Sequence, residues 1–263
     1  MKKYLVIGNP IEHSLSPQLH NYWFKKNNID AIYDKEKLKI DDLENLILRI
    51  KEKKINGVNV TVPFKNEIIS YMDELSFGSK NTMSINTIYF KNEKVIGHNT
   101  DIDGFKFAMN DIEFDLENKK ILILGAGGVV PSIIFALNKM KVSKIILSNR
   151  TKNKAEKLVD MFKNITVVDW GEVPDFDMII NATSVGLNKN DVIDLNFSKL
   201  ERGKFFYDVI YSPKETNFLK NAKRLGHNTE NGKKMFIYQA AAAFKLWHGF
   251  EPRIDNNILK LLD

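Results

Sequence analysis

The sequence predicts an α/β protein with two domains. Short apolar segments of strand length alternate with segments whose apolar residues follow helical spacing, and this alternation is typical of parallel sheets covered by helices. One apolar strand, residues 121–124, leads directly into the glycine-rich turn 125–128 and then into a helical segment. A chain of 263 residues can hold two domains with separate cores. We therefore expect an N-terminal α/β domain and, from near Asp101, a doubly wound Rossmann-type domain.

The N-terminal domain should begin with a strand and then a helix that opens at Ser16 and Pro17. Ser16 has the side chain of an N-cap, and the fixed φ of Pro17 suits the first helical position. Helical spacing of apolar residues predicts a second helix through Leu43, Leu46, Ile47 and Ile50. The expected strands cover residues 4–7, 31–33, 59–62, 85–90 and 94–97, the last two as a hairpin.

The second domain should alternate regularly between helix and strand. Its first helix begins near Asp101 and passes through Phe105 and Met109. The expected strands cover residues 121–124, 144–147, 165–168, 177–180 and 205–209. The expected helices cover residues 155–162, the segment through Met235, Gln239 and Phe244, and residues 254–262. This order predicts a parallel, doubly wound sheet.

Composition excludes several classes of protein. Hydrophobic residues make up 43% of the chain and charged residues 27%, as in ordinary globular proteins. No apolar run approaches the roughly 20 residues that span a bilayer, and the apolar residues 4–7 are too few for a signal peptide. The chain has no cysteine, which excludes disulfides and thiolate metal sites and fits a reducing cytoplasm.

The formal net charge of +6 raises the question of an anionic partner. The lysines are scattered along the chain without interleaved aromatic residues or a recognisable nucleic-acid module. We therefore expect most of them to lie on a solvated surface, and we expect neither nucleic acid nor a membrane as a partner.

One strand of the N-terminal domain has a polar face. Alternate side chains of a strand share a face, so Asn59 and Thr61 should point towards a binding site and Val62 towards the core. Pro63 suits the first position of a helix, which would put Lys65 in the opening turn. A cation is disfavoured at that end of a helix, so the position favours use of Lys65 as an acid or base. The alternative is an edge strand followed by a solvated lysine.

The turn at residues 125–128 has the position of a dinucleotide-binding turn. Glycines there let the backbone turn tightly and approach a pyrophosphate, which then faces the free N–H groups of the helix start. Val130 takes the place of a third glycine and Pro131 follows it. We expect the helix to start there, with Pro131 in its first turn.

The end of the next strand favours NADP over NAD. An NAD site normally carries Asp or Glu there to bind the ribose hydroxyls, whereas this chain has Asn149, Arg150 and Thr151. Arg150 and the nearby Lys154 could hold a 2′-phosphate through charge-assisted hydrogen bonds of about 1.5–3 kcal/mol each. The alternative is that both are ordinary surface charges at a helix start.

Short motifs follow one another in a specific order along nearly the whole chain. They are residues 8–11, 13–17, 59–65, 85–87, 99–101, 125–128, 149–151, 181–184 and 207–208, with Gly232, Met235, Gln239, Ala240, Ala243, Phe244 and Trp247. Together they resemble the shikimate dehydrogenase family. The resemblance implies a substrate domain over residues 1–101, completed by C-terminal helices over 236–263, and an NADP-binding Rossmann domain over 102–235.

The resemblance also implies a reaction and a setting. The reaction is the reversible, NADPH-dependent reduction of 3-dehydroshikimate to shikimate, on the route to chorismate and the aromatic amino acids. We expect a cytoplasmic enzyme, a monomer or a homodimer, with a small-molecule substrate and no metal. A quinate/shikimate dehydrogenase of broader specificity and a non-catalytic NADP-sensing module are the alternatives.

Site residues follow from the same resemblance. Lys65 and Asp101 match the catalytic pair. The residues that match substrate contacts are Ser14, Ser16, Asn59, Thr61, Lys65, Asn86, Asp101, Tyr211 and Gln239. Those that match cofactor contacts are Gly125, Ala126, Gly127, Gly128, Val129, Asn149, Arg150, Thr151, Lys154, Thr183 and Gly232. Plainer roles remain open: the two serines and Asp101 could serve only as helix caps, and Gln239 could be a core amide.

Overall fold

The computed structural model describes residues 1–262, and the chain divides into two compact units. The first unit comprises Met1–Phe105 and the chain from Ile237 onward, and the second comprises Lys106–Phe236. The divisions fall inside the helices α5 (Asp101–Asn110) and α9 (Lys233–His248). Each of these helices therefore contributes residues to both units.

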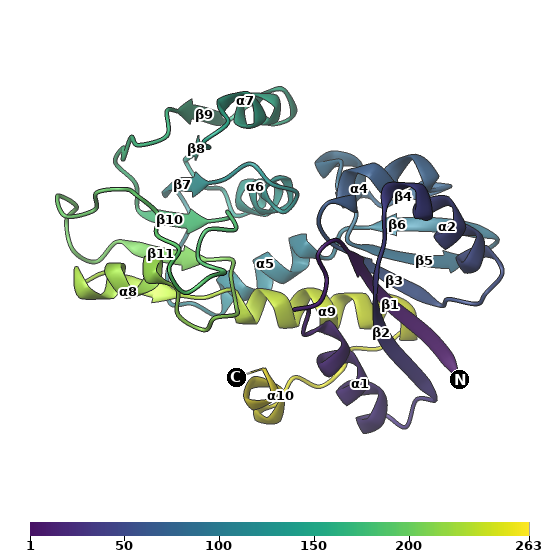
Figure 1. Ribbon diagram of the computed structural model, residues 1–263. Coiled ribbons are helices and arrows are strands. Elements are labelled where there is room, and N and C mark those ends of the chain that lie inside the picture. Colours follow the sequence, from purple (N-terminus) through teal and green to yellow (C-terminus); the bar gives the residue numbers. More distant parts are fainter. Residues whose placement is uncertain (263) are drawn as a thin grey trace. The chain divides into compact units, whose positions relative to one another are not determined.

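The first unit contains a mixed sheet with the strand order β2-β1-β3-β5-β6-β4 (Figure 1). β1 pairs in parallel with β2 and β3, whereas β5 runs antiparallel to both β3 and β6. The strands are β1 (Lys2–Gly8), β2 (Ala31–Lys37), β3 (Gly57–Val60), β4 (Glu74–Leu75), β5 (Thr87–Lys91) and β6 (Lys94–His98). The helices are α1 (Ser16–Lys26), α2 (Leu43–Lys51), α3 (Phe64–Glu67), α4 (Phe77–Thr82) and α10 (Asn256–Leu261), with 3₁₀ turns η1 (Ile40–Asp42) and η2 (Ile68–Tyr71).

The hairpin predicted near residue 92 is confirmed. β5 and β6 pair through Lys91 and Lys94, and the two residues between them, Asn92 and Glu93, have φ values of 51° and 57°. Positive φ at both central residues is the geometry that matches the twist of a two-residue hairpin.

Each face of the first sheet carries its own core. On one face, α2 buries the four residues whose spacing predicted it, Leu43, Leu46, Ile47 and Ile50, in a cluster that includes Leu5 of β1. Tyr4 precedes Leu5 and so points to the opposite face, where its ring lies 5.0 Å from that of Trp247 in α9. Gly57 of β3 lies under this indole, and a Cβ there would come within 2.4 Å of Trp247 Nε1. A side chain at position 57 would therefore displace Trp247, which donates from Nε1 to Ile88 O at 3.2 Å.

Two local features of this unit contradict the sequence predictions. The helix α1 already includes Ser16, and the N-cap residue is Leu15, whose side chain makes no cap hydrogen bond. The strand β3 ends at Val60, and Val62 is 57% exposed instead of lying in the core. Pro63 follows immediately and has no N–H to donate to a ladder, so the chain leaves the sheet before it.

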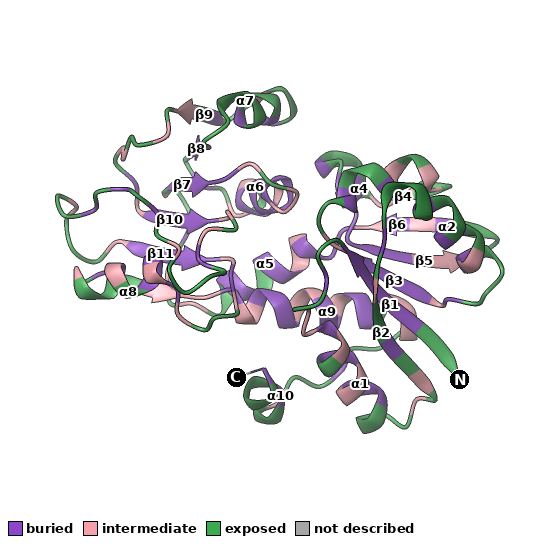
Figure 2. Cartoon of the chain, in the orientation of Figure 1, coloured by how far each residue is buried: buried purple, intermediate pink, exposed green. Residues whose placement is uncertain are grey.

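The second unit contains a parallel sheet with the strand order β12-β11-β10-β7-β8-β9, which confirms the predicted doubly wound arrangement. The strands are β7 (Lys120–Leu124), β8 (Lys144–Ser148), β9 (Ile165–Val168), β10 (Met178–Asn181), β11 (Phe205–Asp208) and β12 (Asn228–Glu230). The helices are α6 (Val130–Lys139), α7 (Lys152–Met161) and α8 (Asn217–Arg224). Figure 2 shows β7, β10 and β11 as buried strands, as expected for a sheet covered on both faces.

The strand order of the second sheet reverses at β7. This strand lies between β8, which follows it in sequence, and β10. In open parallel sheets, ligands bind outside the carboxyl ends of the strands at such a reversal. The turn that starts at Gly125 follows the carboxyl end of β7 and therefore lies at this point.

Candidate active site

Lys65 and Asp101 form a buried ion pair in the first unit. Lys65 is the second residue of α3 and Asp101 is the first residue of α5. Lys65 Nζ donates a hydrogen bond to Asp101 Oδ2, and the two side chains are 10% and 9% exposed. The interpretation of Lys65 as a solvated lysine is therefore wrong. Pro63 is the N-cap residue of α3 and not its first helical residue, but Lys65 does lie in the opening turn.

Asn86 connects this ion pair to other polar groups. Its Nδ2 donates to Asp101 Oδ1 at 2.9 Å, to Thr100 Oγ1 at 2.9 Å and to Gln239 Oε1 at 3.4 Å. Its Oδ1 accepts from Thr100 N at 2.7 Å. Asp101 is therefore bonded on both carboxylate oxygens, one to an ammonium and one to an amide, and its side chain is not simply a helix cap.

Asn59 extends the network into the sheet, and Thr61 lies beside it. Asn59 Nδ2 donates to Asn86 O at 3.1 Å and to Thr87 Oγ1 at 3.0 Å. Thr61 follows the last residue of β3 and is half-buried, and its N–H donates to Ile7 O at 2.9 Å. The two predicted side chains are thus neighbours along the chain, although only Asn59 belongs to a strand.

The two predicted serines lie at the start of α1. Ser16 is 6% exposed, and its backbone N–H donates to Ser14 Oγ at 3.3 Å. Tyr211 belongs to the second unit, where its ring stacks on that of Phe236 with centroids 4.3 Å apart.

The glycine turn of the second unit fits a dinucleotide. Gly125 has φ +111°, and a Cβ there would meet Ala182 O at 2.9 Å. Gly127 is exposed, and a Cβ there would have no neighbour within 4 Å. The backbone at Gly127 is therefore open to a ligand that packs against it. Ala126, Gly128 and Val129 are half-buried, and α6 starts at Val130 with Pro131 in its first turn, as predicted.

The residues predicted to select NADP lie between β8 and α7. Asn149 Nδ2 donates to Thr151 O at 2.7 Å, and Thr151 is the N-cap residue of α7. Arg150 and Lys154 are exposed, and within residues 1–262 neither forms an ion pair. In contrast, Lys152 pairs with Asp169 at 2.6 Å. Arg150 and Lys154 thus have guanidinium and ammonium groups available to an anion.

Thr183 and Gly232, two of the predicted cofactor contacts, also have structural roles within the second unit. Thr183 Oγ1 donates to Asn181 Oδ1 at 2.7 Å, and Asn181 Nδ2 donates to Asp208 Oδ1 at 3.0 Å. Burial raises the pKa of Asp208, against the hydrogen bond from Thr216 Oγ1. This buried network fixes the loop after β10, and sequence reasoning assigned no role to Asn181 or Asp208 beyond the motif. Gly232 is buried against the backbone of Val209, and a Cβ at Gly232 would lie 2.0 Å from Val209 O.

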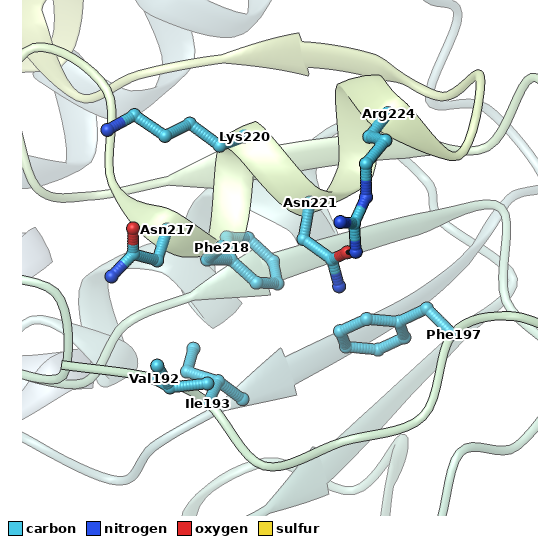
Figure 3. A pocket seen from close by; sticks show the side chains of 8 residues that line it. All are labelled: Val192, Ile193, Phe197, Asn217, Phe218, Lys220, Asn221 and Arg224. Carbon is cyan, nitrogen blue, oxygen red and sulfur yellow. Dashed lines mark hydrogen bonds between the residues drawn. The ribbon is translucent and has the colours of Figure 1, made fainter. Parts of the chain in front are cut away.

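A groove of about 400 Å³ lies beside α8 in the second unit (Figure 3). Three of the residues that line it, Ile193, Phe197 and Phe218, belong to the buried core of this unit. The other lining residues of the groove are Val192, Asn217, Lys220, Asn221 and Arg224, and no predicted site residue is among the eight.

Together, the parallel sheet with its glycine turn and the buried lysine–aspartate pair define a two-domain, dinucleotide-dependent oxidoreductase. Three family models match the chain: the shikimate dehydrogenase substrate binding domain over residues 6–88, shikimate / quinate 5-dehydrogenase over residues 106–210, and the shikimate 5'-dehydrogenase C-terminal domain over residues 234–256. The chain belongs to the shikimate dehydrogenase family.

Individual relatives agree with the family models. The chain is 56% identical over 262 residues to shikimate dehydrogenase (NADP(+)) from Pelagibacter ubique, covering 100% of this chain and 99% of the relative. The crystal structure of shikimate dehydrogenase from Aquifex aeolicus matches with a TM-score of 0.90 at 36% identity, covering 100% and 97% of the two chains. The enzyme from Thermus thermophilus, in complex with NADP(H) and shikimate, matches with a TM-score of 0.90 at 27% identity, covering 100% and 98%.

Proposed function

We propose that this protein is a shikimate dehydrogenase that reduces 3-dehydroshikimate to shikimate, reversibly and with NADPH, in the biosynthesis of chorismate and the aromatic amino acids. The observation that carries the proposal is the buried pair of Lys65 and Asp101, which is tied through Asn86 to Gln239. These residues belong to the first unit, most of whose N-terminal part matches the substrate-binding family model.

Lys65 is suited to the proton chemistry of this reaction. Bound NADPH would supply a hydride to the carbonyl carbon of the substrate. The carbonyl oxygen then gains negative charge, which the Lys65 ammonium can stabilise and to which it can donate a proton. Asp101 accepts from Lys65 and from Asn86, so it holds the ammonium and the neighbouring amide in place. We infer that Asn59, Thr61, Asn86 and Gln239 contact the ring substituents, and that Ser14 and Ser16 bind the substrate carboxylate. The contact of Tyr211 with the substrate stays a prediction from the family resemblance.

The second unit is the proposed cofactor domain. Gly125, Gly127 and their neighbours in the turn would cradle the pyrophosphate against the start of α6. Arg150 and Lys154 would bind the 2′-phosphate. The hydrogen bond from Asn149 to Thr151 would hold the loop between β8 and α7 in shape. Thr183 and Gly232 would complete the wall of the cofactor site. Because the 2′-phosphate is absent from NADH, the protein should prefer NADPH by about tenfold to hundredfold.

Absorbance at the NADPH band tests the proposal directly. The purified protein is mixed with 3-dehydroshikimate and NADPH, then with NADH, and finally with quinate and oxidised cofactor. We expect consumption of NADPH, slower consumption of NADH and little reaction with quinate. Folded protein that consumes no NADPH would refute the enzyme proposal, and tight NADPH binding in that case would favour the NADP-sensing module. Comparable rates with quinate would favour the broader quinate/shikimate dehydrogenase.

The variant Lys65→Ala tests the proton donor. Its kcat should fall by about 10²–10⁴-fold, while the KM for 3-dehydroshikimate changes less, because the ammonium acts mainly on charge that develops in the transition state. Lys154→Ala, in the other unit, is a control that also removes one lysine and should raise the KM for NADPH instead. An unchanged kcat in Lys65→Ala would show that another group supplies the proton.

We also propose that the protein works in the cytoplasm as a monomer or a homodimer. The absence of cysteine supports a reducing compartment. Within residues 1–262, no helix is long and apolar enough to cross a membrane. Light scattering during size-exclusion chromatography would give the oligomeric state, and a larger assembly would contradict the proposal.

A further inference from the structure

The hydroxyl of Tyr33 is hydrogen-bonded to a residue of the candidate active site. Tyr33 lies on β2, an edge strand of the first sheet, and is 1% exposed. Its hydroxyl donates to Asn59 Oδ1 at 2.7 Å, and both groups are buried. Asn59 has already been described as a donor to Asn86 and Thr87. Tyr33 therefore reaches the network of Lys65 through one intervening side chain.

The Asn59 amide has a defined orientation, because Asn86 O can only accept and therefore requires Nδ2 on its side, while the Tyr33 hydroxyl donates to the amide oxygen. Both N–H groups of Nδ2 have protein partners, namely Asn86 O and Thr87 Oγ1. The carboxamide oxygen has two lone pairs, of which Tyr33 occupies one. In this orientation, the remaining lone pair of Oδ1 is the group that Asn59 can offer to a ligand. Asn59 can therefore accept a hydrogen bond from a hydroxyl without giving up a protein contact.

Helix α1 holds Tyr33 in place. The Asn21 side chain exchanges two hydrogen bonds with the Tyr33 backbone, donating to its carbonyl oxygen at 2.8 Å and accepting from its N–H at 2.9 Å. The ring of His20 stacks on the ring of Tyr33 with centroids 4.3 Å apart and planes 3° apart. Within residues 1–262, neither ring nitrogen of His20 has a hydrogen-bond partner, so His20 acts here as a flat packing surface. Backbone and ring of Tyr33 are thus both restrained before any substrate binds.

We propose that Tyr33 is a positioning residue that orients the Asn59 amide so that its oxygen accepts a hydrogen bond from a ring hydroxyl of the substrate. Tyr33 would thereby help to select a hydroxylated ring. The inference rests on the proposed function, in which Asn59 contacts the substrate. Without the Tyr33 hydroxyl, Asn59 Oδ1 loses its buried donor and the amide is held only through Nδ2, so its oxygen is less firmly placed to accept from a substrate hydroxyl.

The variant Tyr33→Phe tests the proposal, with Tyr22→Phe as a matched control. Tyr22 belongs to the same unit, and its hydroxyl bonds to the Asp255 carboxylate at 3.2–3.3 Å. Tyr33→Phe should raise the KM for 3-dehydroshikimate about three- to tenfold, the range expected for one hydrogen bond, and leave kcat and the KM for NADPH nearly unchanged. Tyr22→Phe should leave all three constants unchanged, even if it lowers Tm as much. Equal KM values for 3-dehydroshikimate in wild type and Tyr33→Phe would overturn the proposal.

A double-mutant cycle shows whether Tyr33 acts through Asn59. In an Asn59→Ala background, the further change Tyr33→Phe should not raise the KM again, because its target is already gone. Additive effects of the two changes would refute the positioning role. If the wild-type protein does not turn over 3-dehydroshikimate, the proposed function fails instead, and this is a different result.

A measurement on the unaltered protein covers the case in which the variants do not fold. The side-chain amide protons of Asn59 should exchange slowly with solvent, as seen by NMR, both without and with saturating shikimate. This slow exchange is expected because bound shikimate should leave both protein contacts of Nδ2 intact. Loss of this protection when shikimate binds would mean that the N–H groups turn to the ligand, which would overturn the proposal.

Discussion

Gly127→Ala separates cofactor binding from folding, because the structure predicts opposite effects on the two. A Cβ at Gly127 meets no atom within 4 Å, and its φ lies outside the left-handed region. The change should therefore leave the free energy of unfolding the same or raise it by about 0.4–1 kcal/mol, as alanine restricts the unfolded chain. The open space at this Cβ is where the pyrophosphate is proposed to pack. A methyl group there should cost at least one charge-assisted hydrogen bond, about 1.5–3 kcal/mol, and raise the KM for NADPH about tenfold to hundredfold.

Steady-state kinetics at varied NADPH, together with thermal unfolding of the same samples, measure both quantities. Gly125→Ala is the contrasting control, because its φ of +111° and its approach to Ala182 O at 2.9 Å should make that variant less stable. A folded Gly127→Ala protein with an unchanged KM for NADPH would refute the assignment of this turn to the pyrophosphate. A large loss of stability in Gly127→Ala would refute the reading of its Cβ position as open space.

Two further predictions concern stability. Gly232→Ala should lower the free energy of unfolding by about 1–3 kcal/mol or more, because its Cβ would lie 2.0 Å from Val209 O. Denaturant unfolding of this variant and of Gly127→Ala would measure the difference, and equal stability of the two variants would contradict the prediction. Burial lowers the pKa of His20 to about 3 from 6.5, so the unfolded chain binds a proton below pH 6.5 that the folded protein does not. Stability should therefore fall by about 2 kcal/mol between pH 7 and pH 5 on account of His20, and His248, with a pKa near 4, adds to this loss. Urea unfolding at several pH values should show a smaller loss in His20→Leu, and an identical pH profile would show that His20 is not the group responsible.

Most of the fold followed from local patterns. The parallel sheet of the second unit was predicted because its strands are short, apolar and separated by helices. The turn after β7 was predicted because its glycines lie between an apolar strand and a helix, and Gly125 does have a φ of +111°. The strands β4 and β12 were missed because they have only two and three residues, which is too short for an alternation of apolar and polar residues to be recognised. The helices α4 and α8 were missed because they are short and rich in Asn, Ser, Gly or Lys, without a long apolar period.

The sequence by itself determined the two α/β halves, the glycine turn and the family to which the chain belongs, and it predicted Arg150 and Lys154 as ligands of the 2′-phosphate. These depend on residue type and on spacing along the chain. Only the tertiary structure decided that Lys65 is buried against Asp101, that Asn86 reaches Gln239 from 153 positions away, and that the Tyr33 hydroxyl donates to Asn59 from 26 positions away. Such contacts join side chains on different strands and helices, and their partners are set by sheet order and packing, which no local period of the sequence encodes.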